Sequence, residues 1–255
     1  MDEFYSYLER RMRPNSVKAY RKAFGAYVAW LNGEDPSANN AQEYLDHLET
    51  SGRKPNGICL VANSIRRYFK WKTGNDIHLD HPSPHIGEPV YLSKEQFDNL
   101  IKACHTPLEK ALIYGVYDTA CRISEFLNIR KKDIDWEHGL ITVTRKGGRI
   151  AQVNISEKAM SVLDSFLSIR NSKSERVFMD MTYNDAWSLF KEIGKRVGLN
   201  IHPHMLRHTR AIHMLENKAQ INVVQGHLGH RNIGTTMDIY GRFRPIDLKE
   251  KIPTW

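Results

Sequence analysis

The sequence has no long run of apolar residues. Its apolar stretches all fall short of the roughly 18 residues that a helix needs to cross a bilayer, although hydrophobic residues make up 41% of the chain. Its first residues, Met1-Asp2-Glu3-Phe4, are acidic and amphipathic, without the basic start and apolar stretch of a secretory signal. We therefore expect a globular protein that has no membrane partner and stays in the cytoplasm.

Cysteine is also scarce. The three cysteines, Cys59, Cys104 and Cys121, are odd in number and widely spaced. A disulfide framework needs paired cysteines, and a structural zinc site needs closely spaced ones. The sequence therefore argues against both. It also contains no internal repeat and no low-complexity tract.

The charge is not balanced. The chain has 37 lysines and arginines against 29 aspartates and glutamates, which gives a formal net charge of +8. A basic protein favours an anionic partner, nucleic acid among others. Many basic proteins bind nothing in particular, however, so the motifs must identify the partner.

A chain of 255 residues is long enough for two ordinary domains. Its first part shows apolar residues at helical spacing, and Ser16 is expected to cap the first clear helix. Between Thr73 and Val90 the periodicity stops, and glycine and proline recur instead. We predict a helical domain over residues 1–75, a linker over 76–90 and a second domain over 91–255.

A basic stretch lies near the end of the first domain. Arg66, Arg67, Lys70 and Lys72 interleave with aromatic residues in a helical pattern. Such a pattern is typical of a helix that grips a phosphate backbone, and equally of an ordinary solvated helix face. The stretch is therefore a candidate DNA contact, and the solvated face stays open as the alternative.

The second domain opens with a capping box, in which Ser93 is followed three residues later by Gln96. A different pattern covers residues 139–155, where apolar and polar residues alternate on both sides of the basic segment Arg145-Lys146-Gly147-Gly148-Arg149. Alternation around a glycine turn is typical of a β-hairpin. We predict helices on both sides of this hairpin.

Four short segments of the second domain carry candidate chemistry. They are Cys121-Arg122-Ile123-Ser124-Glu125, the hairpin tip with Lys146, His204-Met205-Leu206-Arg207-His208-Thr209, and Leu228-Gly229-His230 followed by Tyr240. Each has an ordinary structural explanation when taken singly, such as a surface ion pair, a soluble turn or a helix cap. Their order and spacing together are much more specific.

Taken in order, these segments resemble the active-site series of the tyrosine recombinase family, which includes phage integrases and Xer-type resolvases. The resemblance covers roughly residues 16–240. It implies a mainly α fold with a small β-sheet, in which a helical SAM-like core-binding domain precedes a mixed α/β catalytic domain. The sequence departs from the family pattern at Cys121, at His227, which replaces a common leucine, and in its short segment after Tyr240.

The resemblance implies that Tyr240 is the nucleophile and that Arg122 and Arg207 hold a DNA phosphate. A guanidinium is charged at any working pH and its planar fork fits phosphate oxygens, so arginine suits this task better than lysine. A phenol with a reference pKa near 10 is almost fully protonated at neutral pH, so the nucleophile also needs a proton acceptor nearby.

The remaining roles also come from the resemblance. His204 is expected to act as a general base or phosphate ligand, and His230 as a further donor to the phosphate. Lys146 would protonate the leaving 5′ oxygen, and Glu125 would orient the arginine and histidine groups. The product would be a 3′-phosphotyrosyl link that conserves the energy of the phosphodiester, so we predict no cofactor, no metal and no ATP.

The expected partner is double-stranded DNA at a specific site, on which copies of the chain assemble into a synaptic tetramer in the nucleoid. Arg145 and Arg149 are further candidate DNA contacts, and the apolar tail after Tyr240 is expected to dock on a neighbouring subunit or to pack in its own. Two alternatives stay open: a type IB-like topoisomerase, and a DNA-binding architectural protein without activity.

Overall fold

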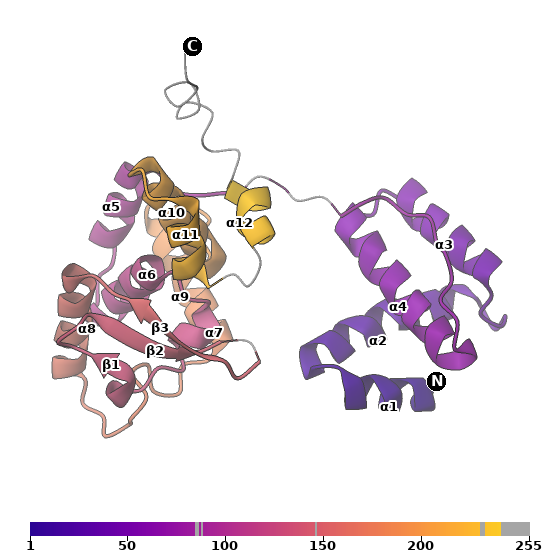
Figure 1. Cartoon of the computed structure of the whole chain (residues 1–255), viewed down its shortest axis with the longest axis horizontal. Coiled ribbons are helices and arrows are strands. Elements are labelled where there is room, and N and C mark those ends of the chain that lie inside the picture. Colours follow the sequence, from indigo (N-terminus) through magenta and orange to yellow (C-terminus); the bar gives the residue numbers. More distant parts are fainter. Residues whose placement is uncertain (85–86, 88, 146, 230–232, 241–255) are drawn as a thin grey trace, which may run out of the picture. The chain divides into compact units, whose positions relative to one another are not determined.

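The computed structural model describes residues 1–84, 87, 89–145, 147–229 and 233–240. The chain forms two compact units, Met1–Gly87 and Glu88–Trp255, each with its own hydrophobic core (Figure 1). No helix in the described ranges is long and apolar enough to pass through a membrane. Lys146, His230 and the tail from residue 241 fall outside the described residues.

The N-terminal unit is a bundle of helices: α1 (Asp2–Arg11), α2 (Pro14–Trp30), α3 (Ala38–Thr50) and α4 (Pro55–Thr73) (Figure 1). Aromatic rings from three of them form its centre. The Phe24 ring lies with its centroid 5.1 Å from that of Phe4 and 4.6 Å from that of Tyr68. Such contacts add to the stabilisation from burying the rings, so they join α1, α2 and α4 into one core.

The expectation that Ser16 caps the second helix is wrong. Helix α2 already begins at Pro14, and the extended residue Arg13 occupies the cap position. Proline is well suited to the first helical position because its fixed φ matches the helix and its missing N–H has no helical partner to lose there. Proline at the start of the helix was therefore the stronger signal.

The C-terminal unit is mainly helical. Its helices are α5 (Lys94–Lys102), α6 (Pro107–Thr119), α7 (Ile123–Phe126), α8 (Glu157–Ile169), α9 (Tyr183–Arg196), α10 (Pro203–Glu216), α11 (Ile221–Leu228) and α12 (Ile233–Tyr240). The capping box at the start of α5 is confirmed, because Ser93 and Gln96 exchange both of its hydrogen bonds. Helix α6 packs against α8 and α10, which makes it the central helix of this unit.

A small antiparallel sheet completes the unit, with β1 (Ile134–Asp135), β2 (Leu140–Thr144) and β3 (Ile150–Asn154) in that order (Figure 1). The predicted hairpin is confirmed: Ile141 pairs with Val153, and both side chains are buried. Strand β1 was not predicted because two residues are too few to show a period. The expected fold, mainly α with a small sheet, is confirmed.

Candidate active site

Helix α10 carries two of the predicted site residues, His204 and Arg207. Pro203 occupies its first turn, and the ring of His202 caps it by accepting a hydrogen bond from the backbone N–H of Met205 at 3.2 Å. The helical repeat then places His204 and Arg207, three residues apart, on one face. His208 follows directly and contributes to the same site.

Arg207 lies inside the protein, with 4% of its surface exposed. Its guanidinium donates to the backbone carbonyl of Ala120 and, at 2.8 Å, to that of Leu228. Burial, and after it the positive charge of Arg122, lowers the pKa of Arg207 to about 10. The guanidinium therefore stays charged at neutral pH and is held in a fixed position by two carbonyl groups.

Arg122 caps the short helix α7, and Glu125 holds it there. Its guanidinium donates to a carboxylate oxygen of Glu125 at 2.8 Å. The Glu125 side chain is 5% exposed, whereas 36% of the Arg122 side chain faces solvent. A buried carboxylate thus orients an arginine whose remaining donors can meet a ligand.

The carbonyl of Leu228, at the end of α11, accepts a hydrogen bond from a second arginine. Arg145 donates to it at 2.5 Å from the hairpin. Gly229 ends α11 in the left-handed conformation, at φ 65°, and a Cβ there would collide with the Arg145 guanidinium. The absence of a side chain at Gly229 therefore lets the hairpin, α10 and α11 meet at one carbonyl.

This position of Arg145 revises its expected role. As a candidate DNA contact it should be exposed, yet it is 6% exposed and bonded within the protein. The Leu228 carbonyl also accepts from Arg207, so Arg145 is the second donor to one buried oxygen. Arg149, the other candidate at the hairpin tip, is exposed.

Tyr240, the predicted nucleophile, ends α12 and is 1% exposed. Its hydroxyl oxygen lies 2.5 Å from Nδ1 of His208. Burial raises the pKa of Tyr240 to about 12, and burial together with the charges of His204 and Arg207 lowers the pKa of His208 to about 4. At neutral pH the phenol is therefore protonated and the imidazole neutral, so the hydroxyl can donate to the ring.

His208 was not singled out from the sequence. It was part of the quoted segment His204-Met205-Leu206-Arg207-His208-Thr209, but only the histidine before the arginine received a role. His204 is exposed, and its pKa is lowered by partial desolvation and by the charge of Arg207. The structure thus places one histidine at the tyrosine hydroxyl and leaves the other facing solvent.

The candidate DNA contacts on α4 differ in their freedom. Arg66 binds both carboxylate oxygens of Asp76, at 3.1 and 2.9 Å, and the Arg67 guanidinium lies over the Tyr7 ring. Lys70 and Lys72 are exposed, although the Lys72 ammonium lies 5.6 Å from the centre of the Tyr68 ring. Lysines on flexible stems in solvent are suited to phosphate contacts, so they are the stronger candidates of the four.

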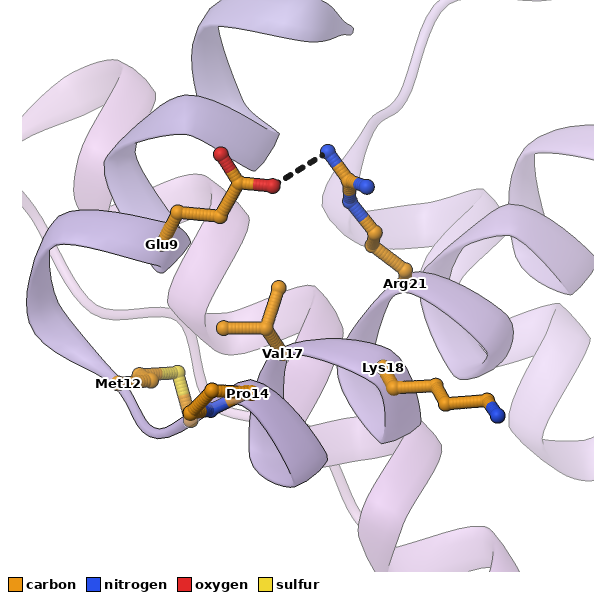
Figure 2. Close-up of a pocket in the computed structure, with 6 residues that line it drawn as sticks. All are labelled: Glu9, Met12, Pro14, Val17, Lys18 and Arg21. Atoms are coloured by element: carbon orange, nitrogen blue, oxygen red, sulfur yellow. Dashed lines mark ion pairs between the residues drawn. The ribbon is translucent and has the colours of Figure 1, made fainter.

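A surface pocket of about 430 Å³ in the N-terminal unit is lined by residues of α1, of α2 and of the turn between them. Figure 2 shows the apolar side chains of Met12, Pro14 and Val17 below an ion pair in which Arg21 meets Glu9 at 3.0 Å. It holds none of the predicted site residues. Elsewhere in the described ranges, no cluster of three or more histidines, cysteines or carboxylates has an arrangement that could hold a metal ion.

Known proteins share this sequence pattern. Residues 90–245 match the phage integrase family, and residues 1–75 match the phage integrase N-terminal SAM-like domain. The tyrosine recombinase XerA of Pyrococcus horikoshii is 29% identical over 265 residues, which cover 99% of this chain and 92% of the relative. XerD of Listeria innocua is 26% identical over 285 residues, covering 98% and 96%.

Solved structures share the fold. The Tn1549 transposon integrase in complex with transposon right end DNA matches with a TM-score of 0.79 at 16% identity, over 98% of both chains. The XerH recombinase bound to difH substrate matches with 0.75 at 19% identity, over 94% of this chain and 79% of that one. With the family pattern covering most of both units, the chain belongs to the phage integrase family and is a tyrosine recombinase.

Proposed function

We propose that this recombinase cleaves and rejoins DNA at a specific site through a 3′-phosphotyrosyl intermediate formed by Tyr240. The observation that carries the proposal is the 2.5 Å contact between the Tyr240 hydroxyl and His208, one residue from Arg207. A tyrosine, a neutral imidazole and a fixed guanidinium are the groups that such a cleavage needs. Chain segments far apart in the sequence supply them to one site.

The two arginines meet the main electrostatic demand. Attack on a phosphodiester places negative charge on the non-bridging oxygens, so positive donors must already be in position. Arg122 has donors that face solvent, and Arg207 is held by Ala120 and Leu228. The two carbonyls use two of the five N–H donors of the Arg207 guanidinium, so further donors remain for a phosphate oxygen.

The chemistry is a single displacement at phosphorus. The bond from the Tyr240 oxygen to phosphorus forms, and the bond from phosphorus to the 5′ oxygen breaks. The phenolic proton passes to an imidazole, and a second proton reaches the leaving oxygen. We assign the acceptor role to His208, with His204 then as the phosphate ligand, and Lys146 as the acid.

His230 would add a donor to the phosphate, and Glu125 holds Arg122. Because the new phosphodiester conserves the energy of the old one, a free 5′ hydroxyl can attack it to rejoin the strand. This reaction requires neither ATP nor a metal ion, since clustered positive side chains stabilise the charge.

The proposed partner is double-stranded DNA, clamped by a core-binding domain of residues 1–75 and a catalytic domain of 91–255 joined by the linker 76–90. Two of the structural relatives were solved bound to DNA, one to transposon right end DNA and one to a difH substrate. We further propose assembly into a tetramer at the synapse, with the apolar tail docked on a neighbouring subunit. Deleting residues 245–255 should then impair synapsis more than binding to a single site.

Strand exchange between two duplexes tests this function. The substrate is a pair of labelled duplexes carrying the chain's own target site, incubated in EDTA without ATP. Recombinant joints should form with the wild-type chain and not with Tyr240→Phe. Relaxation of a supercoiled plasmid in a parallel assay, without joints between the duplexes, would instead support a type IB-like topoisomerase, and binding without cleavage would support an architectural protein.

A further inference from the structure

A second group of polar side chains lies next to the site, centred on Asp118. This aspartate is 2% exposed and lies near the end of α6, two residues before the Ala120 carbonyl that accepts Arg207. It bonds to three other elements of the C-terminal unit. Each of those elements also carries a predicted site residue or a group bonded to one.

The first bond runs to α10. One carboxylate oxygen of Asp118 lies 3.3 Å from the guanidinium of Arg210. Arg210 follows Arg207 by three residues, so both arginines lie on neighbouring turns of the same helix. The Arg210 guanidinium also covers the Tyr117 ring, at 5.3 Å from its centroid. This pair fixes the rotation and height of α10 against the end of α6.

The second bond runs to the hairpin. The other carboxylate oxygen of Asp118 accepts the backbone N–H of Ser156 at 2.6 Å. Ser156 comes two residues after the end of β3 and caps α8. This bond therefore anchors the end of the hairpin whose other strand leads to Arg145, and through Arg145 to the Leu228 carbonyl.

The third bond runs to α11. Nε2 of His227 lies 2.9 Å from the backbone carbonyl of Asp118. A carbonyl can only accept, so this nitrogen carries the hydrogen and donates. His227 directly precedes Leu228. Its ring therefore links the end of α11, which offers the Leu228 carbonyl to Arg207, to the end of α6, which is followed by the Ala120 carbonyl.

We propose that Asp118, Arg210 and His227 form a positioning cluster that sets the place of the Arg207 guanidinium relative to Tyr240 and the hairpin. The inference rests on the proposed function. The cluster does not touch the reacting atoms; it holds the two carbonyls between which Arg207 is fixed. A buried ion pair such as that of Asp118 and Arg210 contributes little net stability, because the cost of desolvating the two charges offsets their attraction. Its effect should appear in the geometry of the site, and hence in the cleavage rate.

The test uses His227→Leu, which keeps an apolar body and removes the donor, and His227→Gln, which restores a side-chain N–H. Cleavage of a nicked suicide duplex is measured in single turnover with saturating enzyme, alongside DNA affinity and the unfolding midpoint. We expect His227→Leu to cleave about 10- to 100-fold more slowly, with affinity within about threefold. His227→Gln should recover most of the rate.

Three further variants separate positioning from folding. His138→Leu removes an exposed histidine that pairs only locally with Asp135, and it should cleave at the wild-type rate. Combining His227→Leu with Arg207→Lys should cost little more than Arg207→Lys alone, because both changes disturb the same guanidinium. Asp118→Asn, which loses the Arg210 pair, should repeat the rate loss of His227→Leu.

The outcomes are distinct. A wild-type cleavage rate in His227→Leu and Asp118→Asn, or fully additive losses with Arg207→Lys, would overturn the positioning role alone. Failure of both variants to fold would make the cluster a folding requirement and would overturn it as well. If the wild-type chain itself forms no covalent complex, the proposed function fails and the inference falls with it.

Discussion

Nδ1 of His208 lies 2.5 Å from the hydroxyl oxygen of Tyr240. In the same site Arg207 is bonded to the carbonyls of Ala120 and Leu228. The nucleophile and one of the proposed phosphate ligands therefore both have hydrogen-bond partners within the protein. In the proposed reaction a bound phosphate accepts from the remaining donors of Arg207, and the hydroxyl of Tyr240, a residue that is 1% exposed, moves to the phosphorus atom.

The His208 ring makes stability depend on pH. Its pKa is about 4 in the folded chain, against 6.5 for an unperturbed histidine. Between these pH values the unfolded chain binds more protons than the folded chain. The contribution of the neutral His208 ring to the free energy of unfolding is therefore complete above about pH 6.5 and is lost as the pH falls toward 4. The unfolding midpoint should therefore drop from pH 7 to pH 5, and His208→Gln should show a smaller drop. An equal drop in both proteins would contradict the burial of a neutral ring.

Arg207→Ala should lower the cleavage rate by at least about a hundredfold, since it removes a fixed positive donor from the developing charge. It also leaves two buried carbonyls with one donor fewer, which should cost stability of about 1–3 kcal/mol. Arg207→Lys keeps the charge but loses the planar fork of donors, so its cleavage rate should lie between those of the wild-type chain and Arg207→Ala. Single-turnover cleavage below the unfolding temperature measures the rates of both variants, and denaturant unfolding measures the loss of stability. Near-normal cleavage by Arg207→Ala would remove it from the site.

Lys70 and Lys72 should contribute to DNA affinity through phosphate contacts. Each exposed lysine that meets a phosphate releases a counterion on binding, so each replacement by glutamine should reduce the salt slope of the logarithmic affinity by about 1. Titration of labelled duplex at several salt concentrations measures the slope. Lys131→Gln, which removes an exposed lysine outside α4, serves as the control. An unchanged slope in the α4 variants would identify that helix face as merely solvated.

Local patterns predicted much of this fold. The hairpin and the capping box were both predicted because each depends on a few neighbouring residues. The hairpin follows from the alternation around residues 145–149, and the capping box from Ser93 and Gln96. The contact between His208 and Tyr240 joins residues 32 positions apart. No periodicity encodes such a contact, because it depends on how α10 and α12 pack.

The burial of Arg145 also could not be predicted from the sequence. A basic residue on a turn usually faces solvent, and the sequence carries no sign of the carbonyl that draws it inward. The cluster around Asp118 is similar, since Asp118, Arg210 and His227 come from three helices. Only His227 stood out beforehand, as a departure from the family pattern, and its partner became visible only in the folded chain.

Lys146 can be tested as an acid separately from its charge. An alkoxide leaves slowly without a proton, whereas a thiolate, from a thiol of pKa near 8.5, leaves readily. Replacing the bridging 5′ oxygen by sulfur should therefore rescue cleavage by Lys146→Ala and do little for Arg207→Ala. Equal rescue of both variants, or of neither, would make Lys146 a charge or a DNA contact and move the acid to another group.

The identity of the residue bonded to DNA tests the central claim most directly. Wild-type chain trapped on a nicked suicide duplex is digested with nuclease and protease, and the modified peptide is located by mass spectrometry. We expect a 3′-phosphate remnant on Tyr240, no adduct with Tyr240→Phe at nearly unchanged DNA affinity, and a normal adduct with Tyr183→Phe, which alters an exposed tyrosine. An adduct on any other residue, or one that persists in Tyr240→Phe, would contradict the account.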